Sequence, residues 1–371
     1  MKIAILTMTF NNNYGGYLQA YALMQILKKL GHEPKLLFVQ PKNNDCITFL
    51  KKYFKKFILS YITTKWKNER YKQIIEKNTK YFSENYIVPK TEPIYSVSDF
   101  KKYKNQFDAY IVGSDQVWRP TMYKYINQAF LDFVENPKAI LLSYAASFGL
   151  EKWEYTNEQT KKFKKDISKF KSISVREDSG VILCKENFEV KALHVLDPTM
   201  LLEIEDYRKI VKQENEPNFK GGLLSYFLDN DEEKQYLENI VASKFGLKSY
   251  NVNVKSNKSN AKLEEQIYPT VTSWIKGFDD AKYVVTDSFH GCVFSILFNK
   301  PFLVYGNKKR GMARFNSLLK MFELEDRLVL KSEDINEKII QENINWVKVN
   351  KILDNYKNIS KNFLIDNLKL G

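Results

Sequence analysis

The stretch that most constrains the fold runs from Tyr283 to Tyr305, where the hydrophobic pattern changes its period twice. Residues 283–286 form a short, apolar, β-branched run that is typical of a buried strand. A polar turn follows at 287–291, then an apolar run of helical length at 292–298 and a second strand-like run at 302–305. This order of strand, turn, helix and strand predicts a parallel α/β sheet. Ligands bind at the carboxyl ends of strands in such sheets, so the turn is a candidate site.

The same alternation recurs along the chain and predicts two α/β domains. Five or more strand-like runs precede about residue 200, several of them separated by helical patterns, and a second series begins at Gly222. The segment 203–220 is polar and charged, and it has the composition of a linker. A length of 371 residues also exceeds what one core usually serves. We therefore expect an N-terminal domain over 1–202, a smaller C-terminal domain over 221–332, and a helical tail over 333–371.

The composition limits which partners and which cellular compartment we expect for this protein. The formal net charge of +14 favours anionic partners, but the lysines are scattered and no nucleic-acid-binding motif is present, so we expect no nucleic-acid partner. Cys46, Cys184 and Cys292 lie far apart, which predicts neither a disulfide framework nor a metal site. No run approaches the roughly 20 apolar residues that span a bilayer. A cytoplasmic protein is the simplest interpretation.

The segment 42–90 is basic and amphipathic. Leu50, Phe54, Phe57 and Tyr61 recur at helical spacing, with lysines between them. Two interpretations stay open. A helix packed on the protein with a lysine-rich outer face is favoured, and a peripheral contact with the inner face of the membrane is the alternative, which would suit a lipid-linked substrate.

Polar residues follow the other predicted strands as well. The turn 11–16, Asn-Asn-Asn-Tyr-Gly-Gly, lies between the first strand and the first helix, where backbone N–H groups can approach a ligand. It fits neither the dinucleotide-binding nor the P-loop pattern, and a tight turn without a ligand is the alternative. Ser114, Asp115, Gln116 and Trp118 follow the strand 107–113, and Ser147 follows the strand 140–146. These positions predict the edge of a site.

The three histidines occupy different kinds of position. His32 follows a helix end and is expected to be solvated. His194 lies in an apolar strand and is expected to be buried with its hydrogen bonds satisfied. His290 stands at the carboxyl end of a strand, beside Asp287 and Ser288. It is therefore either a catalytic group or a structural group that caps the following helix.

Several of these segments, taken together, resemble the polysaccharide pyruvyl transferase family. The matching stretches are ILTMTFNNNYGGYLQAYAL, YIVGSDQVW, SYAASFG, ISVREDSG, VLDPTMLL, TDSFHG, NKPFLVYG and RFNSLLKMFELEDRLV, which run in the family's order from residue 3 to about residue 329. The resemblance implies two Rossmann-like domains in a GT-B-like arrangement with an interdomain cleft. It also implies transfer of a pyruvyl group from phosphoenolpyruvate to two hydroxyls of a bacterial cell-surface polysaccharide, such as a capsule or exopolysaccharide, with no cofactor.

The resemblance also implies roles for residues. His290 corresponds to the family's general acid, and Arg176 to the arginine of its VRE-type stretch. The family carries an arginine two positions before the histidine, where this chain has Ser288. Arg176, Lys308, Lys309, Arg310 or Arg314 would then have to hold the anionic donor, since a guanidinium matches carboxylate and phosphate.

The other candidate site residues complete the hypothesis. The base that takes a hydroxyl proton is Asp115, or alternatively Asp287. The donor side comprises Arg176, Ser288, Gly291, Lys309, Arg310 and Arg314, and the acceptor side comprises Asn13, Tyr14, Gly15, Gly16, Ser114, Gln116, Trp118 and Ser147. Two other functions stay open because Ser288 replaces the arginine: a GT-B-like glycosyltransferase that uses a nucleotide sugar, and a non-catalytic saccharide-binding relative.

Overall fold

Two parallel β-sheets form the frame of the protein. The computed structural model describes residues 1–40, 70–229, 231–256, 261–306, 311–335 and 337–369. The first sheet has six strands in the order β2-β1-β3-β4-β5-β6, and the second has five in the order β11-β10-β9-β7-β8. Every pairing between these strands is parallel. The predicted fold class, two Rossmann-like α/β domains, is confirmed.

The first sheet and its helices come from the N-terminal half of the chain. Its strands are β1 (Lys2–Leu6), β2 (Glu33–Leu36), β3 (Ala109–Val112), β4 (Ile140–Ala146), β5 (Ser172–Val175) and β6 (Leu193–His194). Its helices include α1 (Tyr14–Lys29), α4 (Lys77–Tyr86), α5 (Val97–Phe100), α6 (Asn157–Ile167) and α7 (Asp178–Leu183). Every residue of β3 is buried, because helices cover both faces of a parallel sheet and its strands are then apolar throughout.

The second sheet follows, with the stretch 283–305 at its centre. Its strands are β7 (Gly222–Tyr226), β8 (Lys248–Tyr250), β9 (Tyr283–Thr286), β10 (Phe302–Tyr305) and β11 (Leu328–Val329). Its helices include α9 (Glu232–Phe245), α10 (Leu263–Gln266), α11 (Val271–Asp280), α12 (Phe289–Leu297) and α13 (Ala313–Phe322). Every residue of β9, α12 and β10 is buried, as the apolar pattern predicts.

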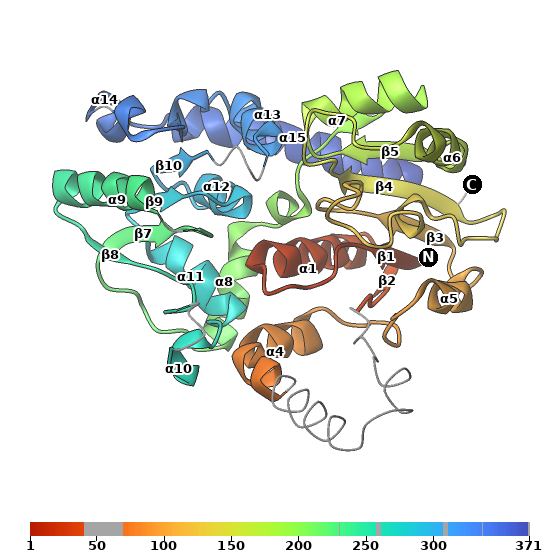
Figure 1. The fold of residues 1–371 in the computed structure, drawn as a ribbon, viewed down its shortest axis with the longest axis horizontal. Helices are drawn as coiled ribbons and strands as arrows, with labels where there is room; N and C mark the ends of the chain where they lie inside the picture. Colours follow the sequence, from red (N-terminus) through yellow and green to blue (C-terminus); the bar gives the residue numbers. More distant parts are fainter. Residues whose placement is uncertain (41–69, 230, 257–260, 307–310, 336, 370–371) are drawn as a thin grey trace, which may run out of the picture.

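Helices connect the two domains at two places. The segment 203–220, predicted as a linker, contains the amphipathic helix α8 (Ile204–Gln213), which packs against α11 of the second domain. After the short α14 (Glu337–Gln341), the long helix α15 (Trp346–Asn367) returns to the first domain, as Figure 1 shows. There the hydroxyl of Ser360 accepts a hydrogen bond from the backbone N–H of Leu196 at 3.0 Å. The predicted helical tail is therefore part of the packing of the first domain.

Only part of the basic segment 42–90 can be described. Its residues 42–69 lie outside the described part of the chain, and its C-terminal part contains α4, on which Phe82 is buried. Among the described residues, no helix is both long enough and apolar enough to cross a membrane.

Candidate active site

His290 stands where the two domains meet. Ser288 caps α12, accepting a hydrogen bond from the backbone N–H of Gly291 at 3.3 Å, and this fixes the first turn that carries His290. The imidazole faces the first turn of α1 in the other domain. A Cβ atom on Gly15 would lie only 1.9 Å from Nδ1 of His290, so α1 can approach the ring only because residue 15 has no side chain. Figure 1 shows α1 and α12 between the two sheets.

The other imidazole nitrogen faces a buried charge network. Nε2 of His290 lies 3.5 Å from Oδ2 of Asp197, which is an ion-pair distance and too long for a strong hydrogen bond. The same carboxylate oxygen accepts a hydrogen bond from Arg176 at 2.8 Å, and the second terminal nitrogen of Arg176 donates to Asp115 at 3.0 Å. All four residues are at most 7% exposed. One arginine thus joins two carboxylates from the first domain beside a histidine from the second.

The network sets the ionisation of its carboxylates. Burial alone would raise the pKa of Asp197, but His290 and Arg176 outweigh burial and hold that pKa well below its ordinary value. The pKa of Asp115 is lowered in the same way: burial opposes ionisation, and Arg176, His290 and Arg314 together outweigh it. Both carboxylates are therefore anions at neutral pH. A protonated His290 would be stabilised by Asp197 directly.

Asp115 is held by a tightly shaped turn after β3. Its φ of 71° lies in the left-handed region, which is uncommon for a residue with a side chain. Gly113 has a φ of 132°, and a Cβ there would lie 2.0 Å from the carbonyl oxygen of Tyr144. The hydroxyl of Ser114 is 3.2 Å from Oδ2 of Asp197, and its backbone N–H donates to Gln19 at 3.2 Å. Strained residues of this kind are characteristic of functional sites.

Glu177 is the centre of a second hydrogen-bonded cluster, which adjoins the first. One of its carboxylate oxygens accepts hydrogen bonds from the Ser147 hydroxyl at 2.9 Å and from the backbone N–H groups of Phe148 and Gly149. Burial raises the pKa of Glu177, with Arg176 opposing the shift. Ser147, predicted on the acceptor side, therefore holds a buried carboxyl group in place. Gln116, also predicted there, accepts a hydrogen bond from Arg119 at 3.1 Å.

Arg314 lies close enough to this network to act with it. Its guanidinium carbon is 5.7 Å from the centre of the Phe289 ring, and that of Arg176 is 4.5 Å from the same ring. Burial, followed by the nearby charge of Arg176, lowers the pKa of Arg314 to about 10, while Asp115 and Glu177 act against this shift. Two arginines therefore converge on the residue directly before His290. An anionic ligand would relieve the repulsion between them.

Asp287, the second candidate base, faces a different environment. Its carboxylate pairs with the buried Nζ of Lys234 at 2.9 Å and accepts hydrogen bonds from the backbone N–H groups of Leu228 at 2.6 Å and Asp229 at 3.4 Å. These contacts tie the turn after β9 to the loop after β7. Asp287 thus positions the turn that carries His290, and its oxygens are not directed into the Asp197 network.

The remaining residues predicted for the site have different structural roles. Gly291 packs closely on Thr286, where a Cβ would lie 2.3 Å from the hydroxyl oxygen. Asn13 caps α1 by accepting from the N–H of Gly15 at 3.1 Å, whereas a Cβ on Gly16 would make only an ordinary contact, with Asn13 at 3.8 Å. Trp118 is fully buried, stacked on Phe130. Lys308, Lys309 and Arg310 lie outside the described residues.

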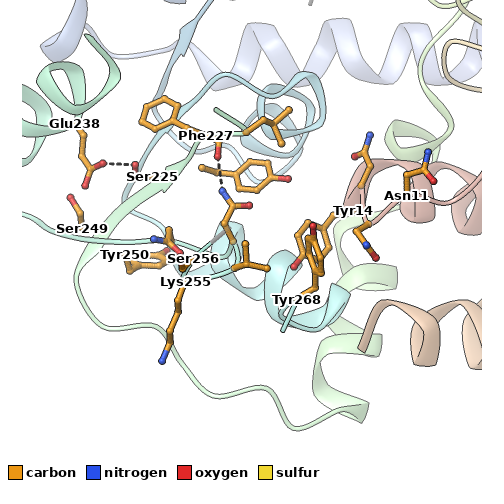
Figure 2. A pocket seen from close by; sticks show the side chains of 17 residues that line it. Asn11, Tyr14, Ser225, Phe227, Glu238, Ser249, Tyr250, Lys255, Ser256 and Tyr268 are labelled. Carbon is orange, nitrogen blue, oxygen red and sulfur yellow. Dashed lines mark hydrogen bonds between the residues drawn. The ribbon is translucent and has the colours of Figure 1, made fainter. Parts of the chain in front are cut away.

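A cavity of about 530 Å³ opens between the two domains, at the start of α1. It lies at the carboxyl ends of β7 and β8, where Figure 2 shows Asn11 and Tyr14 on one side and Ser225, Glu238 and Tyr250 on the other. Asn13 and Tyr14 line it and directly precede Gly15, against which His290 packs. The predicted interdomain cleft is therefore present. Among the residues that the structure describes, no group of histidine, cysteine and carboxylate side chains could hold a metal ion.

Two central residues were absent from the sequence-based site. Asp197 links His290 to Arg176, and Glu177 supports the loop that begins at Ser147. Asp197 directly precedes Pro198 at the carboxyl end of a strand-like run, and this position could have marked it. Nothing local distinguishes Glu177 from a surface carboxylate.

Two facing Rossmann-like domains with a cleft between them define a GT-B-like protein. UDP-N-acetylglucosamine 2-epimerase from Rickettsia bellii has a similar fold, with a TM-score of 0.54 at 11% identity over 98% of this chain and 95% of that one. Arabidopsis thaliana UGT89C1, solved with UDP-L-rhamnose, gives 0.52 at 10% identity over 99% of both chains. No curated protein shows significant sequence similarity.

The family follows from the sequence itself. The model of the polysaccharide pyruvyl transferase family matches residues 13–309, which is well over half of the chain. The protein belongs to this family. The resemblance drawn from the motifs is thereby confirmed, and with it the class of transferase that acts on polysaccharide.

Proposed function

We propose that this protein transfers the pyruvyl group of phosphoenolpyruvate to two hydroxyls of one saccharide, forming a cyclic ketal in a bacterial cell-surface polysaccharide. One observation carries the proposal beyond the family: the general acid His290, from one domain, lies 3.5 Å from Asp197 of the other, in a site where Arg176 and Arg314 converge. An acid beside two guanidiniums suits a donor that must be protonated on carbon and carries a carboxylate and a phosphate.

The reaction assigns a task to each group. Protonated His290, stabilised by Asp197, gives a proton to the methylene carbon of the enol, and the adjacent carbon becomes electrophilic. The first hydroxyl attacks that carbon and gives its proton to Asp115. The second hydroxyl then displaces phosphate, which leaves with the second hydroxyl proton, while the proton on Asp115 restores His290. The proton of the first hydroxyl thus replaces the one that His290 gave to the methyl group, and the proton of the second hydroxyl leaves on phosphate.

Arg314 takes the place of the arginine that Ser288 replaces. Arg176 already binds Asp115 and Asp197, so its charge is largely balanced inside the protein. Arg314 approaches the same ring of Phe289 from α13, with a pKa that its neighbours lower to about 10. Binding the donor's phosphate or carboxylate would stabilise its charge. Asp115 is the base in this proposal because it belongs to the Arg176 network, whereas Asp287 is bound to Lys234.

Acceptor-dependent release of phosphate tests the proposal. The enzyme is incubated with phosphoenolpyruvate and a panel of aryl-linked and lipid-linked sugars, and inorganic phosphate and the ketal are measured. We expect release with at least one acceptor and a loss of roughly 100-fold or more in His290→Gln, with an unchanged Tm. His32→Gln, at a histidine outside the site, is the matched control. Consumption of a nucleotide sugar alone, or full activity in His290→Gln, would contradict the proposal.

A further inference from the structure

We infer that a second cavity, at the C-terminal end of α1, binds an organic phosphate that carries a planar ring, which is the chemistry of a nucleotide. The cavity has a volume of about 560 Å³, a size typical of pockets for small ligands. It lies at the amino ends of β1 and β2, where Lys2 and Glu33, the first residues of these strands, line it. The candidate active site lies at the carboxyl ends of the same strands, so the two sites are separate.

Helix α1 separates this cavity from the candidate active site. Gly15 in its first turn faces His290, whereas Lys28 in its last turn lines the cavity. The helix has 16 residues, which gives it a length of roughly 24 Å. A small molecule in the cavity therefore does not reach His290, and it is neither the donor nor the acceptor of the proposed reaction.

Three lysines from separate elements supply the positive charge of the cavity. Lys2 begins β1, Lys28 lies in the last turn of α1, and Lys35 lies in β2. Glu33 is the one carboxylate that lines the cavity among the described residues. The neighbouring carboxylate of Asp108 accepts the backbone N–H of Lys2 at 2.7 Å, and no carboxylate in the described part of the chain forms an ion pair with any of the three ammonium groups. Lysine ammonium groups bind phosphate as point charges, so the cavity favours a phosphate.

Lys28 is held in place for this contact. Its ammonium donates a hydrogen bond to the backbone carbonyl of Val88 at 2.9 Å, which fixes Nζ and leaves its other N–H groups for a ligand. Burial lowers the pKa of Lys28, because the ammonium loses part of its hydration and gains no carboxylate partner among the described residues. An anion in the cavity would stabilise this charge.

The other residues of the lining suit a planar ring. Phe107 and Pro34 are buried and line the cavity with apolar side chains, and the Phe107 ring is fixed by an edge contact with Tyr110, with 5.6 Å between the ring centres. Apolar faces of this kind pack against a flat heterocycle. The amide nitrogen of Gln106 donates to the carbonyl of Lys102 at 2.6 Å, and its amide oxygen, which makes no hydrogen bond with the described residues, can accept from an N–H group of the ring.

An unpaired polar atom lies in the same lining. His32 follows α1, and its Nδ1 is buried and has no hydrogen-bond partner among the described residues. Burial lowers the pKa of this histidine, so the ring is neutral at pH 7 and offers one nitrogen that donates and one that accepts. A buried polar atom without a partner destabilises the folded chain, and a hydroxyl or phosphate oxygen of a ligand would pair with it.

Calorimetric titration at pH 7 tests the inference. The probes are AMP and UMP, with adenosine and inorganic phosphate as the two separate parts of the ligand. The proteins are the unmodified chain, Lys28→Gln, Lys35→Gln and the control Lys29→Gln, whose side chain pairs with Asp206 and does not line the cavity. We expect AMP or UMP to bind, with affinity about 10-fold lower in each cavity variant and unchanged in the control. Adenosine and inorganic phosphate should each bind at least about 10-fold more weakly than the nucleotide.

Three results would overturn the inference. The first is that neither nucleotide binds to the unmodified chain. The second is that either cavity variant binds the nucleotide as tightly as the unmodified chain, which would place the nucleotide elsewhere, such as in the cleft between the domains. The third is that inorganic phosphate or adenosine binds as tightly as the nucleotide, which would show that the cavity does not recognise a phosphate and a ring together. The titration involves no turnover, so its result is independent of the proposed function.

Discussion

At the scale of single residues, the site depends on Gly15, because no other residue type leaves room for the imidazole of His290. Gly16, its neighbour in the first turn of α1, has no atom nearer than 3.8 Å to the position of a Cβ. The two glycines share a helix, a turn and a residue type, and they differ in what they face. That difference makes them a matched pair for separating the geometry of the site from the stability of the helix.

We predict that Gly15→Ala lowers the turnover number at least 10-fold, because its Cβ would overlap the ring of His290 and displace the proposed general acid. Gly16→Ala should retain activity and stabilise the protein by as much as about 1 kcal/mol, since alanine favours helix. Steady-state kinetics and thermal unfolding of both variants check this. Equal activity of the two variants would show that His290 does not need its position against α1.

A second prediction concerns the buried Asp197. Its pKa is depressed in the folded chain, so below its ordinary pKa of about 4 the unfolded chain binds more protons, and stability falls as the pH falls. Asp197→Asn should lower the free energy of unfolding by about 3–5 kcal/mol at pH 7, since Arg176 loses one partner. At pH 3 the difference from the unmodified chain should be smaller by about 1 kcal/mol.

Urea denaturation at pH 7 and pH 3 measures both differences. Asp354→Asn, at an exposed position of α15, serves as the control and should change stability by less than about 0.5 kcal/mol at either pH. A difference for Asp197→Asn that stays constant or grows toward pH 3 would contradict the assigned direction of the pKa shift.

At the scale of elements, a side chain of α9 holds the turn between β9 and α12 in place. Lys234 is 2% exposed and pairs with Asp287, which also accepts the N–H of Leu228 after β7. The ammonium also lies 5.9 Å from the centre of the Tyr305 ring on β10. The buried ion pair between Lys234 and Asp287 thereby connects the ends of β7, β9 and β10. This arrangement explains why the carboxylate of Asp287, although it is close to His290 in the sequence, holds the turn in place.

We predict that Lys234→Met destabilises the protein by about 3–5 kcal/mol, because it leaves the buried carboxylate of Asp287 without its partner. Lys209→Met, on the exposed face of α8, should change stability by less than about 0.5 kcal/mol. Chemical denaturation compares the two variants. A loss below 1 kcal/mol in Lys234→Met would show that Asp287 is solvated or protonated in the folded protein.

At the scale of the whole molecule, the two domains share the last helix. The buried face of α15 includes Val349, Leu353, Phe363 and Leu364, and its C-terminal part packs on the first domain, with Phe363 6.3 Å from Tyr144 between ring centres. The same helix begins beside α13 of the second domain, with which it is in contact. The chain therefore closes the fold by crossing between the domains twice, at α8 and at α15.

We predict that Leu364→Ala lowers the free energy of unfolding by about 2–5 kcal/mol, since the side chain is fully buried and its removal leaves a cavity. Val347→Ala on the same helix removes a side chain that is 83% exposed and should cost less than about 0.5 kcal/mol. Denaturant unfolding of both variants measures this. Similar losses for the two would mean that α15 is not docked along its length.

The sequence alone determined the fold class and the family. Apolar strands that end in polar turns specify a parallel sheet whatever their partners are, and the ordered motifs identified the polysaccharide pyruvyl transferase family. His290, Asp115 and Arg176 could be found because each follows a strand and the carboxyl ends of parallel strands share one edge.

The tertiary structure decided which of these groups meet. Asp197 binds Arg176 and lies close to His290, although more than ninety residues of chain separate it from the histidine. Asp287, only three residues before the histidine, instead pairs with Lys234. Local patterns fix the period of burial, but they do not fix which buried charges pair, because pairing depends on how loops and helices that are distant in the sequence pack within each domain and between the domains. For the same reason the cleft and its wall at the turn 11–16 could be expected, whereas the residues of the second domain that line the cavity could not.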